Sequence, residues 1–288
     1  MKSIVVLYHK NCPDGFGGAW TAWRKFGDKA EYVPVSANTL PERLPTGKEV
    51  YIIDNSYSRD IMQKLEKSNK SLVVIDHHMS QKDEVSSFPQ NVFDVTHSGS
   101  VLAWKYFFPK KSVPFLLKYV EDRDLWIHKM PHYQEIRMYI DSFPLSFLEW
   151  NKLYKVLETS EGRKNCLKEG GAILRYWDTL VQEAVGNAYL VSFEGHAILA
   201  ANVGTAKLHS TVGHFLHTKQ PPFALTWYED GKEARVSLRS NDTFDVSKIA
   251  KKYGGGGHPR ASGFRFPVEK KKPWKIIKNK SQNSPYSY

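Results

Sequence analysis

Carboxylates and imidazoles gather at four places in the first half of the chain. Three of these places follow short apolar runs, and the fourth is an acidic run farther along. They are residues 9–15 (HKNCPDG), 54–56 (DNS), 76–78 (DHH) and 121–124 (EDRD). Aspartate oxygens and imidazole nitrogens without paired cysteines suit Mn²⁺, Mg²⁺ or Fe²⁺ better than structural Zn²⁺. Two such ions side by side would bridge a phosphate group, activate water and stabilise a leaving oxygen.

Each of these groups also has a purely structural explanation. Asp14 or Asp54 alone is often a helix cap or a turn residue, and His9 alone is often a satisfied polar residue. A structural role does not account for Asp76-His77-His78. Burying three polar side chains after an apolar Val-Val-Ile run costs roughly several kcal/mol unless something such as a metal pairs with them. Since four clusters occur together, we favour a metal site.

The elements that must position these residues alternate in type. Residues 3–8, 31–35, 50–54 and 72–76 are predicted strands, and residues 16–26 and 58–67 are predicted helices. Such alternation is typical of a parallel sheet with right-handed crossovers. The carboxyl ends of parallel strands share one edge, so the polar groups could converge in one crevice.

The pattern changes after about residue 100. From residue 100 to about 186 it is helical, with a long helix over residues 162–185. Strands then return, and Asp230-Gly231 indicates a hairpin between residues 223–228 and 234–238. A helix over residues 245–252, a glycine run and a strand over 262–266 follow.

Composition is that of an ordinary globular protein. The chain has 288 residues, 41% hydrophobic and 25% charged, with two cysteines and a formal net charge of +11. These values exclude a disordered chain and a disulfide scaffold. Its apolar runs are too short to cross a bilayer and its start lacks the features of a signal peptide. We therefore expect a cytoplasmic protein that makes no use of a membrane.

The motifs together resemble one known superfamily. Residues 9–17, Asp54, Asp76-His77-His78, Asp122 and the downstream run GGGGHPRASG (254–263) are similar, in this order, to the DHH/DHHA1 phosphoesterases. That superfamily includes nano-RNases, cyclic-dinucleotide phosphodiesterases and RecJ-type exonucleases, and the resemblance covers roughly residues 3–267.

The resemblance implies an α/β fold in several parts. A parallel-sheet DHH catalytic domain would occupy residues 1–145 and a helical linker residues 146–186. A smaller α/β DHHA1 substrate-binding domain would follow over residues 187–268. Residues 269–288 contain six lysines and one glutamate, and we expect a basic, disordered tail that contacts a polyanion.

The resemblance also implies two divalent metal ions, Mn²⁺ above all. Asp54 would bridge them and His9 would bind one. The other would be held by Asp14, His77 and Asp122, with Asp124 as the alternative to Asp122.

Three further residues of this site have distinct roles. Asp76 would orient the histidines, and His78 would face the scissile phosphate. Cys12 stands where the family usually has its first carboxylate. As a metal ligand, its thiolate would favour Fe²⁺, Co²⁺ or Zn²⁺. The alternative is that Cys12 does not bind a metal ion.

Substrate capture is expected in the second domain. Consecutive glycines let backbone N–H groups converge on an anion. The resemblance assigns nucleotide contacts to Arg239 and His258, with Arg260 and Lys207 as weaker candidates. The glycines concerned are Gly255, Gly256 and Gly257. Residues 98–100 (SGS) at a predicted helix start could bind phosphate or simply cap the helix.

The sequence therefore predicts a metal-dependent phosphodiesterase that cleaves short oligonucleotides or linear dinucleotides to mononucleotides. The same fold could instead act on a cyclic dinucleotide, a 3′-phosphoadenosine-type nucleotide or polyphosphate. A nucleotide-binding regulator without catalysis is a further alternative, supported only by Cys12. The oligomeric state is open, with a homodimer among the options.

Overall fold

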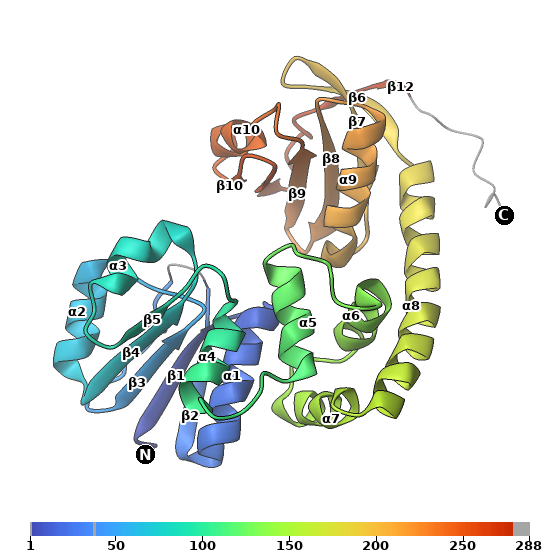
Figure 1. The fold of residues 1–288 in the computed structure, drawn as a ribbon. Helices are drawn as coiled ribbons and strands as arrows, with labels where there is room; N and C mark the ends of the chain where they lie inside the picture. Colours follow the sequence, from blue (N-terminus) through green and yellow to red (C-terminus); the bar gives the residue numbers. More distant parts are fainter. Residues whose placement is uncertain (1, 37–38, 279–288) are drawn as a thin grey trace. The chain divides into compact units, whose positions relative to one another are not determined.

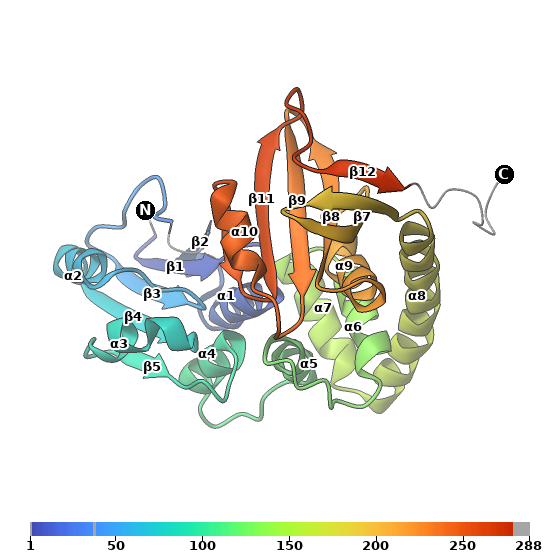
Figure 2. The same ribbon diagram turned by 90° about the horizontal axis from the view of Figure 1, so that it is seen from above.

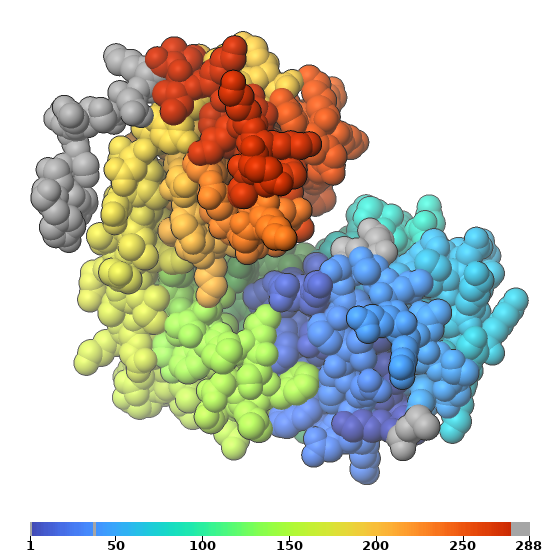
Figure 3. Space-filling view, turned by 180° about the vertical axis from the view of Figure 1, so that it is seen from behind, coloured from blue at the N-terminus to red at the C-terminus, as the bar shows by residue number. Residues whose placement is uncertain are grey.

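The computed structural model describes residues 2–36 and 39–278 of the chain. It divides into two compact units, Met1–Leu174 and Arg175–Tyr288. The boundary falls inside one long helix, α8 (Ser160–Gly186), whose surface is largely exposed (Figure 3). Among the described residues each unit contains one sheet, and the two are described separately.

Unit 1 is built on a five-stranded parallel sheet, sheet A (Figure 1). Its strand order is β2-β1-β3-β4-β5. The strands are β1 (Ile4–His9), β2 (Ala30–Val35), β3 (Glu49–Ile53), β4 (Ser71–Asp76) and β5 (Asn91–Phe93). The predicted parallel sheet is confirmed, with each predicted strand shifted by at most one residue at either end.

Helices cover both faces of sheet A because its strands are apolar on both sides. Val5 and Leu7 pack with the cluster that includes α2 (Arg59–Ser68) and α3 (Lys82–Ser86). Ile4 and Val6 face the opposite way, toward α1 (Pro13–Phe26) and α4 (Gly99–Phe107). This alternation follows from the two-residue period of a strand.

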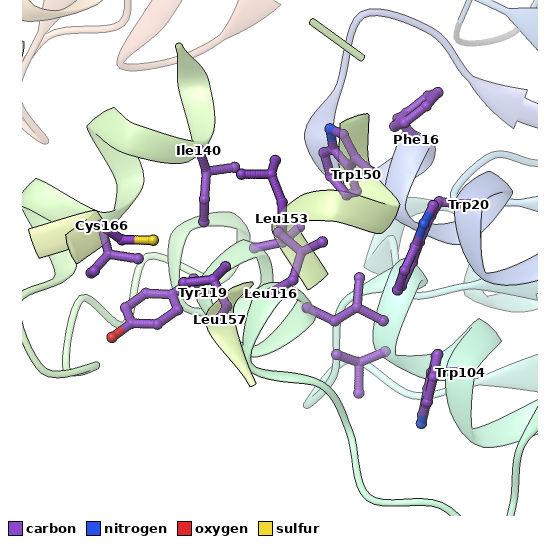
Figure 4. Packing of buried hydrophobic residues seen from close by; sticks show 14 of the residues in the cluster. Phe16, Trp20, Trp104, Leu116, Tyr119, Ile140, Trp150, Leu153, Leu157 and Cys166 are labelled. Carbon is purple, nitrogen blue, oxygen red and sulfur yellow. The ribbon is translucent and has the colours of Figure 1, made fainter. Parts of the chain in front are cut away.

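The helical region after α4 forms a second core within unit 1. It comprises α5 (Phe115–Asp124), α6 (Tyr133–Asp141), α7 (Phe147–Leu157) and the first part of α8. Trp150 and Leu153 of α7 pack with Trp20 of α1 and Leu116 of α5 (Figure 4). Helix α7 was expected in a linker beginning at residue 146. It lies instead inside unit 1, because its apolar face completes this core.

Unit 2 contains a seven-stranded, mainly antiparallel sheet, sheet B (Figure 2). Its strand order is β10-β11-β9-β8-β7-β6-β12, and of these described strands only β7 and β8 run parallel. The strands are β6 (Tyr189–Phe193), β7 (His196–Asn202), β8 (Phe223–Asp230), β9 (Glu233–Ser240), β10 (Gly256–His258), β11 (Ala261–Pro267) and β12 (Lys275–Lys278). Helices α9 (His209–Lys219) and α10 (Val246–Lys252) accompany it, and the predicted hairpin is β8–β9.

The prediction of a disordered tail from residue 269 is wrong for its first part. Trp274 is buried and packs with Val191, Phe193 and Trp227, and β12 pairs with β6. A large aromatic side chain that buries its surface in this way anchors the segment to the core. Residues 279–288 lie outside the described residues.

No helix in residues 2–36 and 39–278 combines the length and the apolar character needed to cross a membrane.

Candidate metal centre

The strand register of sheet A brings the first three polar clusters together. Tyr8 of β1 pairs with Ile53 of β3, and Ile53 pairs with Ile75 of β4. The residues that come next, His9, Asp54 and Asp76, therefore leave the same edge of the sheet at the same level. This edge includes the switch point between β1 and β3, where the strand order reverses and open α/β sheets bind ligands.

Asp54 lies at the centre of the group. Its Oδ2 is 3.4 Å from His9 Nδ1, and its Oδ1 is 3.3 Å from His77 Nε2. Its backbone has φ 55°, a left-handed conformation that aspartate tolerates better than most residues. Burial alone would raise the pKa of Asp54, but its contacts with His77 and His9 outweigh burial, and the pKa lies below the usual range. The carboxylate is thus kept charged.

Asp14 is held by the start of helix α4. Its two oxygens accept hydrogen bonds from the backbone N–H groups of Gly99 (2.7 Å) and Ser100 (3.0 Å). A helix N-terminus favours a negative charge. Residues 98–100, which were expected to bind phosphate or to cap the helix, bind the carboxylate of Asp14. Burial, with the charges of Asp54 and Asp124 added, nevertheless raises the pKa of Asp14 to about 7. A nearby cation would favour its charged form.

His77 faces three carboxylates. Its Nε2 is 3.3 Å from both Asp54 Oδ1 and Asp124 Oδ2, and 3.8 Å from Asp14 Oδ2. Burial lowers the pKa of His77, but these acids raise it to about 9. Among the described residues, the buried Nε2 has no partner in hydrogen-bonding geometry.

A cation fits this arrangement better than direct contacts do. Neighbouring ligand atoms around an ion at 2.1 Å in octahedral geometry lie about 3 Å apart, close to the observed spacing. Ligand atoms of His9, Cys12 and Asp54 all lie within 4.8 Å of one another, and so do those of Asp14, His77 and Asp124. The site thus offers two adjoining sets of three ligands, and Asp54, Asp76, His77 and His78 form a further group of the same kind.

Cys12 belongs to the first of these sets. It precedes α1, whose first residue is Pro13, and burial raises the pKa of its thiol to about 12. Such a thiol stays protonated at neutral pH unless a bound metal ion removes the proton. The structure therefore brings Cys12 within ligand distance, and an ion would have to create its thiolate.

Asp76 and His78 form a hydrogen-bonded pair beside the group. Asp76 Oδ1 lies 2.7 Å from His78 Nδ1 and accepts the backbone N–H of His77 (2.7 Å) and of His78 (3.3 Å). This hydrogen bond raises the pKa of His78. Its imidazole is held at Nδ1, so Nε2 stays free to act on a substrate. Asp76 orients His78 in this way, and it orients only the backbone of His77.

Of the two alternatives at the end of α5, the structure places Asp124 in the group with Asp14 and His77, and Asp122 outside it. The oxygens of Asp122 accept the backbone N–H groups of Lys129 (2.9 Å) and Met130 (3.1 Å). They are thereby committed to the loop after α5. Asp124, at the end of the same helix, contacts His77. The two carboxylates stand two residues apart, and only the structure shows which one faces the cluster.

In unit 2, Arg239 and His258 occupy one row across sheet B. Ala261 of β11 pairs with Arg239 of β9 on one side and with His258 of β10 on the other. Directly paired residues project from the same face of a sheet, and the small side chain of Ala261 leaves room between them. Burial lowers the pKa of Arg239. Within the described residues no carboxylate lies within 4 Å of its guanidinium, so Arg239 is available to an anion.

The glycine run has a packing role as well. A Cβ at Gly255 would meet the carbonyl oxygen of Gly263 at 2.1 Å, and one at Gly257 would meet that of Ala261 at 2.6 Å. Both glycines therefore allow the chain to approach β11 closely, while Gly256 is open to its surroundings. His258 lines a hollow of about 580 Å³ together with Phe244, Lys248 and Arg260. Arg260 also forms an ion pair with Asp242 at 3.3 Å, and Lys207 is exposed on the turn before α9.

Fold and site define a DHH-type phosphoesterase scaffold, and comparison with known proteins agrees. The DHHA1 domain family matches residues 186–274. The uncharacterized protein R106 of Acanthamoeba polyphaga mimivirus is 30% identical over 91% of this chain and 67% of the relative. The chain belongs to the DHH/DHHA1 phosphoesterase superfamily.

Two solved structures share the fold. PggH, a pGpG-specific phosphodiesterase from Vibrio cholerae, superposes with a TM-score of 0.53 at 13% identity, over 93% of this chain and 94% of that one. The DHH domain of PF0399, described as a member of the s1p family of ribosomal proteins, gives 0.57 at 14% identity, over 91% and 82%. These likenesses establish the fold alone.

Proposed function

We propose that the protein is a metal-dependent phosphodiesterase that hydrolyses short oligonucleotides or linear dinucleotides to mononucleotides. The observation that carries this proposal is the pair of adjoining ligand sets at the edge of sheet A, with Asp54 in contact with both. Asp54 reaches His9 through one oxygen and His77 through the other. This is the arrangement expected of a carboxylate that bridges two ions.

His9, Cys12 and Asp54 would hold one divalent ion, and Asp14, His77 and Asp124 would hold the other with Asp54. When bound, two such ions polarise a phosphoryl group, lower the pKa of water and neutralise charge on the leaving oxygen. Mn²⁺ suits the oxygen and imidazole ligands, while Cys12 favours Fe²⁺, Co²⁺ or Zn²⁺.

The chain's own residues would position the substrate. His78, 44% exposed and fixed at Nδ1 by Asp76, presents Nε2 for the scissile phosphate. The pKa of His78 is raised by Asp76, which favours a protonated imidazole that donates to a phosphate oxygen. In unit 2, Arg239, His258 and the N–H groups of the glycine run would bind the phosphate at the end of a nucleotide.

The geometry argues against a regulator without catalysis. That alternative depended on Cys12 as a lost ligand position. Cys12 instead lies within ligand distance of His9 and Asp54, so both ligand sets have three members.

Turnover of a 5′-phosphorylated adenosine dinucleotide tests the proposal, with products separated by chromatography. Metal-free protein is supplied with Mn²⁺, Fe²⁺, Co²⁺, Zn²⁺ or Mg²⁺ in turn, beside Asp54→Asn. Asp60→Asn, at an exposed position on α2, is the matched control. We expect release of mononucleotide that requires metal and Asp54 and that Asp60→Asn leaves intact. Release that persists unchanged in Asp54→Asn would refute the proposal.

A further inference from the structure

Trp126, close in sequence to Asp124, is far more exposed than three other aromatic residues near the two candidate sites. Phe16, Tyr57 and Trp227 are 4%, 1% and 5% exposed, so each is part of a core. Trp126, two residues after Asp124, is 79% exposed. Exposing so large an apolar surface is unfavourable in water, and an exposed aromatic ring beside a polar site is typical of ligand contacts.

The backbone that carries Trp126 is fixed in an unusual conformation. Trp126 and His128 have φ 55° and φ 53°, a left-handed conformation that is rare for bulky residues. The N–H groups of Ile127 and His128 donate to the carbonyl oxygen of Asp122, and those of Lys129 and Met130 donate to its carboxylate. Strained backbone persists where surrounding contacts determine it, and it clusters at functional sites.

The ring of Trp126 is also supported by its neighbours. Its centroid lies 5.4 Å from that of His128, and His128 stacks on Tyr133 at 4.6 Å with an interplanar angle of 23°. Tyr133 is buried. Trp126 is therefore the exposed end of a row of rings anchored in unit 1, with surface left for one more ring.

Its distance from the ligand sets is limited by the chain. Asp124 Oδ2 is 3.3 Å from His77 Nε2, and two residues span at most about 7 Å. Met79, two residues after His77, is 62% exposed. Two exposed apolar side chains thus stand within two residues of the His77–Asp124 contact.

We propose that Trp126 stacks on a nucleobase of the substrate and so selects nucleotides over other phosphodiesters. This inference rests on the proposed function and names the substrate feature that the metal centre cannot recognise. Asp122, which is not among the grouped ligands, is a positioning residue that holds the loop presenting Trp126. Base–aromatic stacking is sequence-tolerant, so all four bases should be accepted.

The test measures binding without turnover in an Asp54→Asn background, alongside turnover in the otherwise unchanged chain. The probes are a 5′-phosphorylated adenosine dinucleotide and two analogues, each lacking the base of one nucleoside. Trp126→Ala should weaken binding of the intact dinucleotide roughly 5- to 150-fold, as expected for loss of one stacked base. Trp126→Phe, which keeps a ring, should recover most of the affinity. Tyr176→Ala, at a 67% exposed aromatic position on α8, is the matched control and should change nothing.

The analogues locate the contact. For the one that lacks the stacked base, the Asp54→Asn protein should bind with equal affinity whether or not it also carries Trp126→Ala. Tryptophan emission gives an independent signal, because dinucleotide binding should quench a component that is missing in Trp126→Phe. If Trp126→Ala is poorly folded, Trp126→Asn suits the left-handed backbone better and replaces it.

The two proposals fail separately. Absence of mononucleotide release from the unsubstituted protein with every metal would overturn the phosphodiesterase. Normal release together with unchanged affinity in Trp126→Ala, or an equal loss for all three probes, would overturn base stacking alone.

Discussion

The two sheets of the protein gather polar groups in different ways. In sheet A, three neighbouring parallel strands end at one edge, and the residues that follow them meet there. In sheet B, which is mainly antiparallel, Arg239 and His258 align across three strands through Ala261. In a parallel sheet, residues that follow neighbouring strands lie close together because the strands end at the same edge. In an antiparallel sheet, which residues lie side by side can be stated only once the register of the strands is known.

The two regions also differ in the charge that they leave unpaired. The edge of sheet A buries Asp14 and Asp54, and the pKa of Asp14 rises because of burial and neighbouring acids. In unit 2 the pKa of Arg239 falls because of burial. A cation would therefore stabilise the charged form of Asp14 in the first region, and an anion that of Arg239 in the second. That division matches metal ions in one and a phosphorylated substrate in the other.

The sharpest test of this division compares Asp54→Asn with Arg239→Gln. Asp54→Asn should lower the affinity for metal at least about 100-fold, since even outer-shell changes cost 10- to 100-fold, and turnover should be lost with it. Arg239→Gln should leave metal binding unchanged and weaken substrate binding roughly 10- to 100-fold, the value of a hydrogen bond to a charged group. Calorimetric titration with metal and then with dinucleotide checks both. Loss of metal binding in Arg239→Gln would contradict the division.

Much of sheet A could be predicted because its signals are local. Each strand is a short apolar run ended by turn residues, and parallel topology then requires the ends to meet. For this reason the sequence could predict that the polar residues at those strand ends lie close together. The choice between Asp122 and Asp124 could not be made from the sequence, because it depends on a loop whose Lys129 and Met130 N–H groups donate to Asp122.

Other features depended on packing between distant residues. Helix α7 has no local signal that separates a linker from a core helix, and its place follows from contacts with Trp20 and Leu116. Trp274 in the lysine-rich segment is another case, since its burial depends on β6 and Trp227. Among the aromatic residues, only burial distinguished Trp126 from Phe16 and Tyr57.

Each of the two regions also contains a glycine that leaves space for a site residue. A Cβ at Gly99 would lie 2.8 Å from Asp54 Cβ and 3.0 Å from Asp14 Oδ2, and one at Gly213 would lie 2.8 Å from Arg239 Cγ. Gly99→Ala should therefore lower metal affinity roughly tenfold or more, with about 1–3 kcal/mol of overpacking cost in stability. Gly213→Ala should weaken dinucleotide binding by a smaller factor and leave metal binding unchanged.

The control for both is Gly171→Ala in α8, where the nearest atom would be 4.0 Å away. This change should be neutral or raise the free energy of unfolding by up to about 1 kcal/mol, because alanine favours a helix. Metal and dinucleotide titrations with denaturant unfolding distinguish the three variants. Equal effects of Gly99→Ala and Gly171→Ala on metal affinity would show that Asp14 and Asp54 need no such space.

Cys12 offers a smaller and more specific test within the first region. Cys12→Asp should shift the preference of the site from Co²⁺ or Zn²⁺ toward Mn²⁺, because a hard oxygen ligand replaces a soft thiolate. In the unsubstituted protein, Co²⁺ should produce a thiolate-to-metal charge-transfer band that Cys12→Ser lacks. Cys166→Ser, in the core of unit 1, should keep the band. An identical Co²⁺ spectrum in Cys12→Ser would exclude ligation.

The smallest expected effect concerns stability in the second region. His209 is 4% exposed, its Nδ1 is 2.6 Å from Thr226 Oγ1, and burial with the charge of Arg239 lowers its pKa to about 4. In the unfolded chain its pKa is about 6.5, so between these values the unfolded state binds more protons. The free energy of unfolding should therefore fall as the pH is lowered from 7 to 5. His209→Gln should reduce that fall. Denaturant titrations at both pH values measure the difference, and an unchanged pH dependence in His209→Gln would mean that Arg239 and burial do not keep this imidazole neutral.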